Sequence, residues 1–178
     1  MKTNITVLQT DITQISVDII VNAANETLLG GGGIDGAIHY AAGPMLLEEC
    51  KTLGGCKTGE AKFTKAYNLS AQYIIHTVGP IYGGENGNEP TLLASCYNNS
   101  IKLADRLKAK TIAFPCISTG AFRYPHDEAT VIAIETVQNY LDNNYTSLEQ
   151  IFFVTYSDLD YKLYKQKLEA GTVDIITL

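Results

Sequence analysis

The 178-residue sequence contains no tryptophan, two methionines and four cysteines. Cys50, Cys56, Cys96 and Cys116 form no C-x-x-C pair, and the three histidines are scattered, so no spacing typical of a zinc site is present and no metal is expected. A chain of this length folds without disulfide bonds, which makes reduced thiols the better expectation. We therefore expect a cytoplasmic protein that needs no cofactor.

Two further absences limit the partners. No apolar run is long enough to span a bilayer, and residues Met1–Asn4 lack the apolar core of a signal peptide, so no membrane association is expected. The net charge is −6, and the basic residues form no dense cluster. Binding to a nucleic-acid backbone depends on Lys and Arg, so nucleic acid is not an expected partner. A small ligand and a monomeric protein are the expectation.

Glycine, by contrast, is abundant, and four of the 15 glycines are consecutive, at Gly30–Gly33. They follow an apolar strand that ends in Asn22 and Asn25, and they precede a helix with Asp35 in its first turn. Four successive glycines carry a large conformational-entropy cost, so packing alone explains them poorly. A backbone without Cβ atoms can approach an anion closely, and a helix N-terminus offers it unpaired N–H groups. The pattern predicts a phosphorylated ligand.

Apolar strands alternate with amphipathic helices along the chain. This alternation predicts one α/β domain over residues 1–178, a three-layer sandwich with a largely parallel sheet. The residues 173–176 are predicted to add an edge strand or simply to dock. The strands are expected at residues 5–9, 18–22, 61–67, 73–78, 111–115 and 151–156, and the helices at 34–41, 45–53, 90–107, 127–140 and 158–168.

In parallel sheets, ligands bind beyond the carboxyl ends of the strands. The segments Asn22–Asn25 and Ser118–Gly120, together with Tyr156, lie at or just past the ends of predicted strands, so we expect them to form one site. Standard motifs fit this site poorly. Glycines in the first loop formally satisfy G-x-G-x-x-G, but they do not follow their strand directly, and no acid-ended strand comes about 20 residues later. Walker and serine-hydrolase motifs are absent from the sequence.

Seven sequence blocks, taken together and in order, resemble a macrodomain of the MacroD type. The resemblance runs from about residue 5 to residue 168, and the combined signature is far more specific than any single glycine loop. The blocks are Thr10–Thr13 (TDIT), Val21–Asn25 (VNAAN), Leu28–His39 (LLGGGGIDGAIH), Ala42–Pro44 (AGP), Thr58–Ala61 (TGEA), His76–Pro80 (HTVGP) and Ile117–Gly120 (ISTG).

This resemblance implies an α/β/α sandwich with a mixed, mainly parallel six-stranded sheet that binds ADP-ribose. It further implies hydrolysis of O-acetyl-ADP-ribose and of ADP-ribose esters on acidic side chains of proteins, which makes mono-ADP-ribosylated proteins further partners. Two alternatives use the same pocket: a reader that binds ADP-ribose without turnover, and an ADP-ribose 1″-phosphate phosphatase. The first choice is the ester hydrolase.

The resemblance also implies a role for each matched residue. Asp11 accepts from the adenine amino group beside the Ile12 backbone, and Tyr156 covers the adenine. Asn25 holds the distal ribose, and Asp35 faces the scissile ester. The remaining ligand-binding residues, most of which clamp the pyrophosphate through N–H groups, are Asn22, Ala24, Gly32, Gly33, Ile34, Ser118, Thr119, Gly120, Ala121 and Phe122.

Several roles stay open at this point. Asp35 and His39 are four residues apart and share a helix face, so Asp35 can orient or deprotonate a water molecule; activation by the substrate's own pyrophosphate is the alternative. His39 either supports the ligand site or is an ordinary helix histidine, while His76 and His126 are predicted to be structural. Arg123 stands where the family usually has glycine, which leaves the geometry of the second loop open.

Overall fold

Strands and helices alternate along the chain, as the sequence predicts. The computed structural model describes the backbone of residues 2–176 and the side chains of residues 2–170. The elements are β1 (Asn4–Gln9), a short 3-10 helix η1 (Ile12–Gln14), β2 (Ile19–Ala24), α1 (Gly33–Ala42), α2 (Met45–Thr52), β3 (Ala61–Lys65), β4 (Tyr73–Val78), α3 (Glu89–Arg106), β5 (Thr111–Phe114), α4 (His126–Asn143), β6 (Gln150–Thr155) and α5 (Asp158–Ile176).

One sequence prediction is wrong. Residues 173–176 do not form an edge strand, because α5 continues through Ile176. The alternative that this tail docks concerns side chains that lie outside the described residues.

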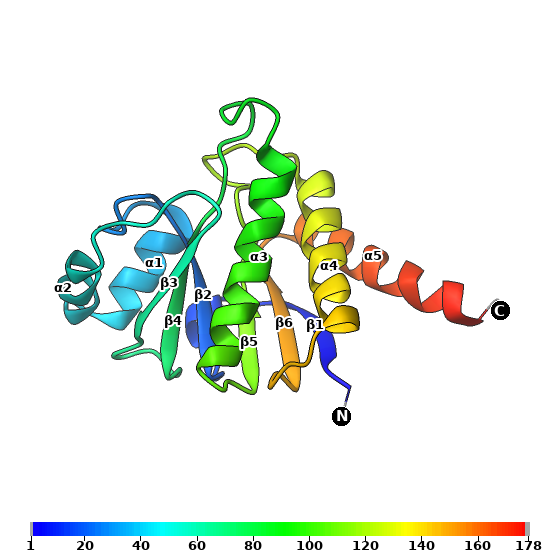
Figure 1. Ribbon diagram of the computed structural model, residues 1–178, viewed down its shortest axis with the longest axis horizontal. Coiled ribbons are helices and arrows are strands. Elements are labelled where there is room, and N and C mark those ends of the chain that lie inside the picture. The colour runs from blue at the N-terminus through cyan, green and yellow to red at the C-terminus, as the bar shows by residue number, and fades with distance from the viewer. Residues whose placement is uncertain (1, 177–178) are drawn as a thin grey trace.

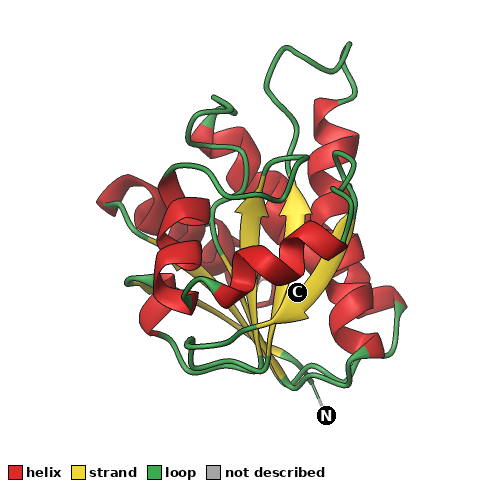
Figure 2. Cartoon of the chain, turned by 90° about the vertical axis from the view of Figure 1, so that its left-hand side faces the viewer, coloured by secondary structure: helices red, strands yellow, loops and turns green. Residues whose placement is uncertain are grey.

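The six strands form one mixed sheet in the order β1-β6-β5-β2-β4-β3. All neighbouring pairs are parallel except β3 and β4, and Figure 2 shows one strand running opposite to the others. The predicted mixed, mainly parallel six-stranded sheet is therefore confirmed. Only Ile19 and Ile20 of β2 pair with β5, whereas β2 pairs with β4 along six residues. The chain leaves β2 for α1 on one face of the sheet and leaves β5 for α4 on the other face. The sheet therefore has a switch point between the adjacent strands β2 and β5, where ligands of open α/β sheets bind.

Two hydrophobic cores cover the two faces of the sheet, which makes the three-layer sandwich. Successive residues of β2 alternate between them: Ile19 and Val21 lie in the core with α3, α4 and Tyr164 of α5, and Ile20 lies in the core with α1 and α2. Figure 1 shows α3 and α4 in front of the strands, and Figure 2 shows helices on both sides of the sheet.

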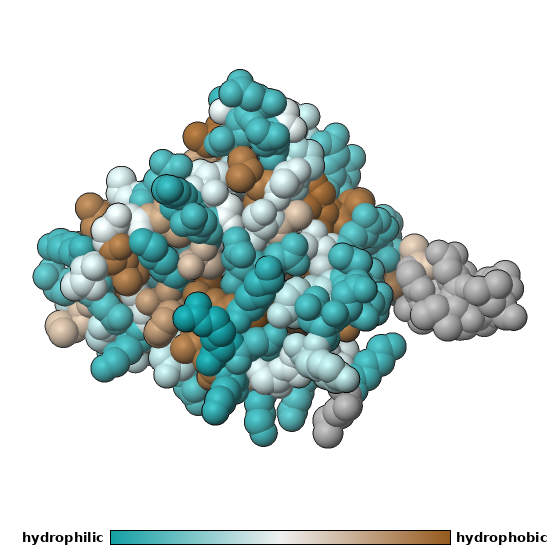
Figure 3. Space-filling view, viewed as in Figure 1, coloured by the Kyte–Doolittle hydropathy of each residue, from teal (hydrophilic) through white to brown (hydrophobic). Residues whose placement is uncertain are grey.

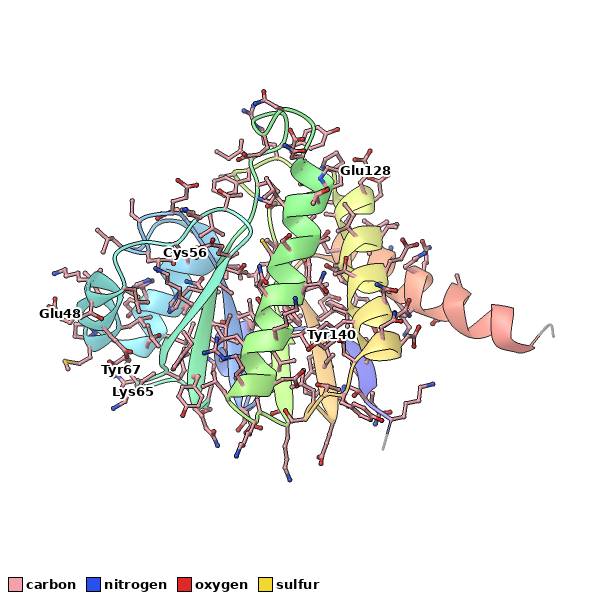
Figure 4. The ribbon with its side chains drawn as sticks, viewed as in Figure 1. Glu48, Cys56, Lys65, Tyr67, Glu128 and Tyr140 are labelled. Carbon is pink, nitrogen blue, oxygen red and sulfur yellow. The ribbon has the colours of Figure 1, made fainter. Side chains whose placement is uncertain are left out.

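Buried or half-buried polar side chains tie the helices to one another and to the edge of the sheet. Asp105 of α3 accepts a hydrogen bond from the Tyr140 hydroxyl of α4 and from the Thr146 hydroxyl in the loop that follows. At the other edge, Tyr67 donates to Glu49 of α2 at 2.7 Å, and Figure 4 places Tyr67 beside α2. This hydrogen bond to Glu49 raises the pKa of Tyr67 to about 12, so the tyrosine remains a donor at neutral pH. The Tyr67 bond ties α2 to the segment that follows β3.

The molecular face in Figure 3 is mostly hydrophilic, with apolar residues in separate patches. Among residues 2–176, no helix combines the length and the apolar character that a membrane span requires.

Candidate functional site

A cavity of about 600 Å³ lies at the carboxyl ends of β2, β5 and β6. The loops that follow these three strands meet at this cavity, as the sequence predicts. The lining residues are Ala23–Asn25, Gly31–Asp35, Gly79, Cys116–Phe122, His126, Val154, Tyr156, Ser157 and Asp160. Because β5 separates β2 from β6, and neighbouring strands lie about 4.8 Å apart, the cavity extends across roughly 10 Å of the sheet edge.

The first loop is shaped by local hydrogen bonds and one buried anchor. Leu28, with a φ of 60°, is 1 % exposed and fixes the middle of the loop in the core. The Asn25 amide donates to the Gly30 carbonyl at 3.0 Å and accepts from the Thr27 hydroxyl at 2.6 Å. Helix α1 begins without a side-chain cap, so no side chain uses the N–H groups of its first turn. Those groups border the cavity and suit an anion.

Asp35 is the acidic group at this end of the cavity, and it is 5 % exposed. Its Oδ1 accepts from the Asn22 amide at 2.8 Å, and His39 Nε2 lies 3.4 Å from the same oxygen. Its Oδ2 is buried and has no hydrogen-bond partner within the described residues. A polar atom buried without a partner is costly, so Oδ2 is available for a ligand or a water molecule.

Gly31 lies close to this oxygen. A Cβ atom on Gly31 would lie 3.1 Å from Asp35 Oδ2 and 3.3 Å from Asn25 Nδ2. The absence of a side chain at Gly31 therefore lets both polar groups pack close to its backbone. All three residues line the cavity, and we call the part of the cavity in front of them the gap beside Gly31.

The second loop is held in a conformation that non-glycine residues seldom adopt. Ser118 has a φ of 68° and Arg123 a φ of 59°. The Arg123 N–H donates to the Gly120 carbonyl at 3.0 Å, and the Tyr124 N–H donates to the Ser118 carbonyl at 2.9 Å. Arg123 thus adopts the left-handed conformation that glycine favours, which settles the loop geometry left open by the sequence. Tyr124, 2 % exposed, is a core residue.

Gly79, which directly follows β4, supports the second loop from behind. A Cβ atom there would lie 2.1 Å from Ser118 Oγ and 2.7 Å from Ile117 Cγ2. Ser118 Oγ is itself buried and unpartnered in the described part of the chain. The absence of a side chain at Gly79 is therefore what allows Ser118 to lie where it does.

At the β6 end, the cavity combines an exposed aromatic side chain with a polar cluster. Tyr156 is 83 % exposed. His126 Nδ1 lies 2.6 Å from Asp160 Oδ1, and Ser157 donates to the other Asp160 oxygen at 3.1 Å. Burial, and secondarily the Asp160 carboxylate, raise the pKa of the Cys116 thiol to about 12. Cys116 therefore faces the cavity as a neutral thiol and not as a nucleophilic thiolate.

Four residues predicted for the site do not line this cavity. Asp11 is exposed, accepts from the Thr13 N–H and hydroxyl of its own turn, and lies at a separate hollow. Ile12 is buried in the α1 and α2 core. Asn22 is fully buried and His39 is half-buried, and both contact Asp35 from behind. The predicted contacts of Asp11 and Ile12 with adenine stay predictions, and Asn22 reaches the cavity through Asp35.

The comparisons with known proteins agree with this architecture. The profile of the Macro domain matches residues 21–133. The chain belongs to the Macro domain family. A Macro domain-containing protein of Chlorobaculum tepidum is 56 % identical over 92 % of this chain and 95 % of its own length. A mutant macrodomain of Oceanobacillus iheyensis, solved with ADP-ribose, is 41 % identical, with a TM-score of 0.89 over 93 % of this chain and 92 % of that one.

The human ADP-ribose glycohydrolase MACROD2 is 51 % identical to this macrodomain over 89 % of the chain. The match covers only 37 % of MACROD2, so this macrodomain spans about a third of that relative.

Sequence reasoning missed several residues of the macrodomain site. Gly31, Gly79 and His126 line the cavity, and His76 lies behind it. For His76 a signal was present, since a histidine in an otherwise apolar buried strand needs a polar partner. Among the side chains of residues 2–170, no cluster of three His, Cys, Asp or Glu is arranged to hold a metal ion.

Proposed function

We propose that this macrodomain binds ADP-ribose and hydrolyses ADP-ribose esters, releasing ADP-ribose and a carboxylic acid. The observation that carries the proposal is the unpartnered Asp35 Oδ2, which is buried at the cavity and faces Asn25 across the gap beside Gly31. O-acetyl-ADP-ribose and mono-ADP-ribosylated acidic side chains are the two substrate classes.

The cavity supports one orientation of the ligand. The pyrophosphate lies between the α1 N-terminus and the second loop, where backbone N–H groups replace lysine; hydrogen bonds to a charged group contribute about 1.5–3 kcal/mol each. The adenine lies at the β6 end, against the exposed ring of Tyr156. The distal ribose lies at the β2 end, where Asn25 and Asp35 line the cavity. The solved relative with ADP-ribose supports this ligand class.

We place the hydrolysis in the gap beside Gly31. A water molecule there donates to Asp35 Oδ2 and attacks the carbonyl carbon of the ester. As the C–O bond forms, its proton passes to Asp35, and the bond from the acyl carbon to the ribose oxygen breaks. The ribose oxygen takes that proton from Asp35, which restores the carboxylate, and the acid leaves. Asn25 has no basic group, so it positions the water or the sugar.

The substrate's own pyrophosphate is the alternative base for this water. A reader without turnover and a 1″-phosphate phosphatase are the alternative functions. A reader needs no carboxylate oxygen left open beside the distal ribose, which favours the hydrolase. A phosphatase would bring a phosphate dianion against the Asp35 carboxylate, and like charges at this range repel.

A substrate panel tests the proposal. The wild-type protein is incubated with O-acetyl-ADP-ribose, with a protein mono-ADP-ribosylated on glutamate, and with ADP-ribose 1″-phosphate, and released ADP-ribose is quantified. We expect release from both esters and none from the phosphate ester above the uncatalysed rate. Calorimetric binding of ADP-ribose without any turnover would instead establish the reader.

Substitution of Gly79 by alanine should weaken ADP-ribose binding. The added Cβ displaces Ser118 and Ile117, since separations of 2.1 and 2.7 Å are too short for carbon contacts. We expect an affinity loss of about 10- to 100-fold, equivalent to one or two hydrogen bonds to a charged group. Titration calorimetry measures this change. Gly83→Ala is the matched control, because a Cβ at that glycine meets no atom within 4 Å.

The control adds backbone strain of its own, because Gly83 has a φ of 79° whereas Gly79 is not among the glycines with positive φ, and Gly83 lies outside the cavity lining. If Gly79→Ala binds ADP-ribose as tightly as Gly83→Ala does, the second loop does not hold the pyrophosphate.

A further inference from the structure

A chain of buried side chains runs from the edge strand β3 to the open carboxylate of the cavity. It consists of Thr64 on β3, His76 on β4, Asn22 on β2 and Asp35 on α1, and we call it the Asp35 relay. We propose that His76 is a positioning residue that holds Asp35 through Asn22, and that Thr64 fixes the tautomer of His76. This inference rests on the proposed function for its effect on turnover.

The contacts of the relay are short and continuous. Thr64 Oγ1 lies 2.9 Å from His76 Nε2, and His76 Nδ1 lies 3.1 Å from Asn22 Nδ2. The same Asn22 nitrogen lies 2.8 Å from Asp35 Oδ1. Thr64, His76 and Asn22 are all 0 % exposed. These side chains are shielded from solvent, so each donor needs an acceptor in the relay or in the neighbouring backbone.

Asp35 at one end of the relay and Thr64 at the other favour the same direction for its hydrogen bonds. Asp35 Oδ1 accepts, so the Asn22 side chain must present its NH₂ group and not its oxygen. The second proton of that NH₂ group points at His76 Nδ1, which must therefore be the unprotonated nitrogen. His76 then carries its proton on Nε2 and donates it to Thr64 Oγ1. Thr64 in turn donates to the Lys65 carbonyl at 3.0 Å.

Only a neutral His76 satisfies this order of donors and acceptors. Burial, and secondarily the nearby His39, lower the pKa of His76 to about 3, so the imidazole stays neutral across the physiological range. The Cys50 sulfur lies 3.9 Å from His76 Nε2, farther than the Thr64 hydroxyl. Thr64 is thus the acceptor that selects the Nε2–H tautomer.

Loss of the Thr64 hydroxyl would disturb Asp35, although Thr64 itself does not line the ligand cavity. With the proton on Nδ1, His76 would present an N–H to the Asn22 N–H group. The Asn22 amide would then turn away, and a full flip would place its oxygen against Asp35 Oδ1. Asp35 would lose the hydrogen bond that directs Oδ2 toward the gap beside Gly31.

Thr64→Val is the test, because valine matches the shape of threonine and removes the hydroxyl. We expect kcat for O-acetyl-ADP-ribose to fall about tenfold, the equivalent of one hydrogen bond to a charged group. KM and the affinity for ADP-ribose are expected to stay within about twofold, because Thr64 lies outside the cavity lining.

Thr77→Val is the matched control. Thr77 follows His76 on β4, is 0 % exposed and also donates to a backbone carbonyl, that of Glu60 at 2.8 Å. Its side chain points to the opposite face of the sheet and touches no member of the relay. We expect Thr77→Val to keep the wild-type kcat. Equal kcat losses in the two variants would show a general packing effect and overturn the proposal.

His76→Leu and His76→Gln test whether His76 acts through its hydrogen bonds or only through the volume that its side chain fills. Leucine offers Asn22 no acceptor, so kcat should fall about tenfold. Glutamine can accept from Asn22 and donate to Thr64, and it should recover most of the lost kcat. Thermal unfolding of each variant identifies those that remain folded. If glutamine fails to exceed leucine in kcat while both are folded, the relay does not act through hydrogen bonds.

A measurement without turnover keeps this inference separate from the proposed function. Nitrogen-15 NMR of the imidazole should show His76 as the Nε2–H tautomer in the wild type, with Nδ1–H appearing in Thr64→Val. A wild-type protein without esterase activity would refute the proposed function but not this tautomer. An Nδ1–H tautomer in the wild type would refute the relay itself.

Discussion

Asp35→Asn is expected to lower kcat for an ADP-ribose ester by about 10²- to 10⁴-fold, the range for loss of a general base. The affinity for ADP-ribose should remain close to that of the wild type. Asparagine has the size of aspartate, and its carbonyl oxygen can still accept from the Asn22 amide, now found at 2.8 Å. What it loses is the ability to take a proton at the position of Oδ2. Single-turnover kinetics and titration calorimetry measure the two quantities.

Asp127→Asn is the control for this variant. Asp127 also lies in the first turn of a helix, α4, but it is exposed and does not line the cavity. It should leave kcat and affinity unchanged. If Asp35→Asn also keeps the wild-type kcat, Asp35 is not the base, and activation of water by the substrate's pyrophosphate becomes the mechanism.

Gly31→Ala is expected to lower kcat by about 100-fold or more, since displacement of a reacting group by about 1 Å costs that much. The new methyl group would lie 3.1 Å from Asp35 Oδ2 and 3.3 Å from Asn25 Nδ2. It pushes both side chains away from the positions in which they hold the attacking water. Binding of ADP-ribose should weaken less than kcat falls, because the pyrophosphate and adenine ends of the cavity are unchanged.

Gly32→Ala adds the same methyl group one residue later. A Cβ there meets no protein atom within 4 Å, and Gly32 has an extended conformation, with a φ of −90°. Any loss in this variant should therefore appear in KM rather than kcat. A kcat for Gly31→Ala that equals the kcat of Gly32→Ala would show that the gap beside Gly31 does not hold the attacking water. A crystal structure of Gly31→Ala would then locate the methyl group relative to Asp35.

The sequence itself determined the architecture and the location of the site. The alternation of apolar strands and amphipathic helices is a local property, because side-chain periodicity follows from backbone geometry, and every central strand was found within a few residues of its prediction. Glycines and short polar residues after the strands marked the loops. Parallel strands place their carboxyl ends at one edge, so loops 23–35 and 116–122 and Tyr156 had to meet there.

Only the tertiary structure decided which side chains face the cavity and which stand behind it. Asn22 and His76 are 54 residues apart, and their hydrogen bond depends on the register of β2 with β4. The gap beside Gly31 depends on how α1 presents Asp35 to the preceding loop, and the strained φ of Arg123 depends on the bonds that hold the second loop. Such features arise from contacts between distant segments. Local sequence patterns do not encode them, because periodicity fixes the face of a strand but not its neighbours.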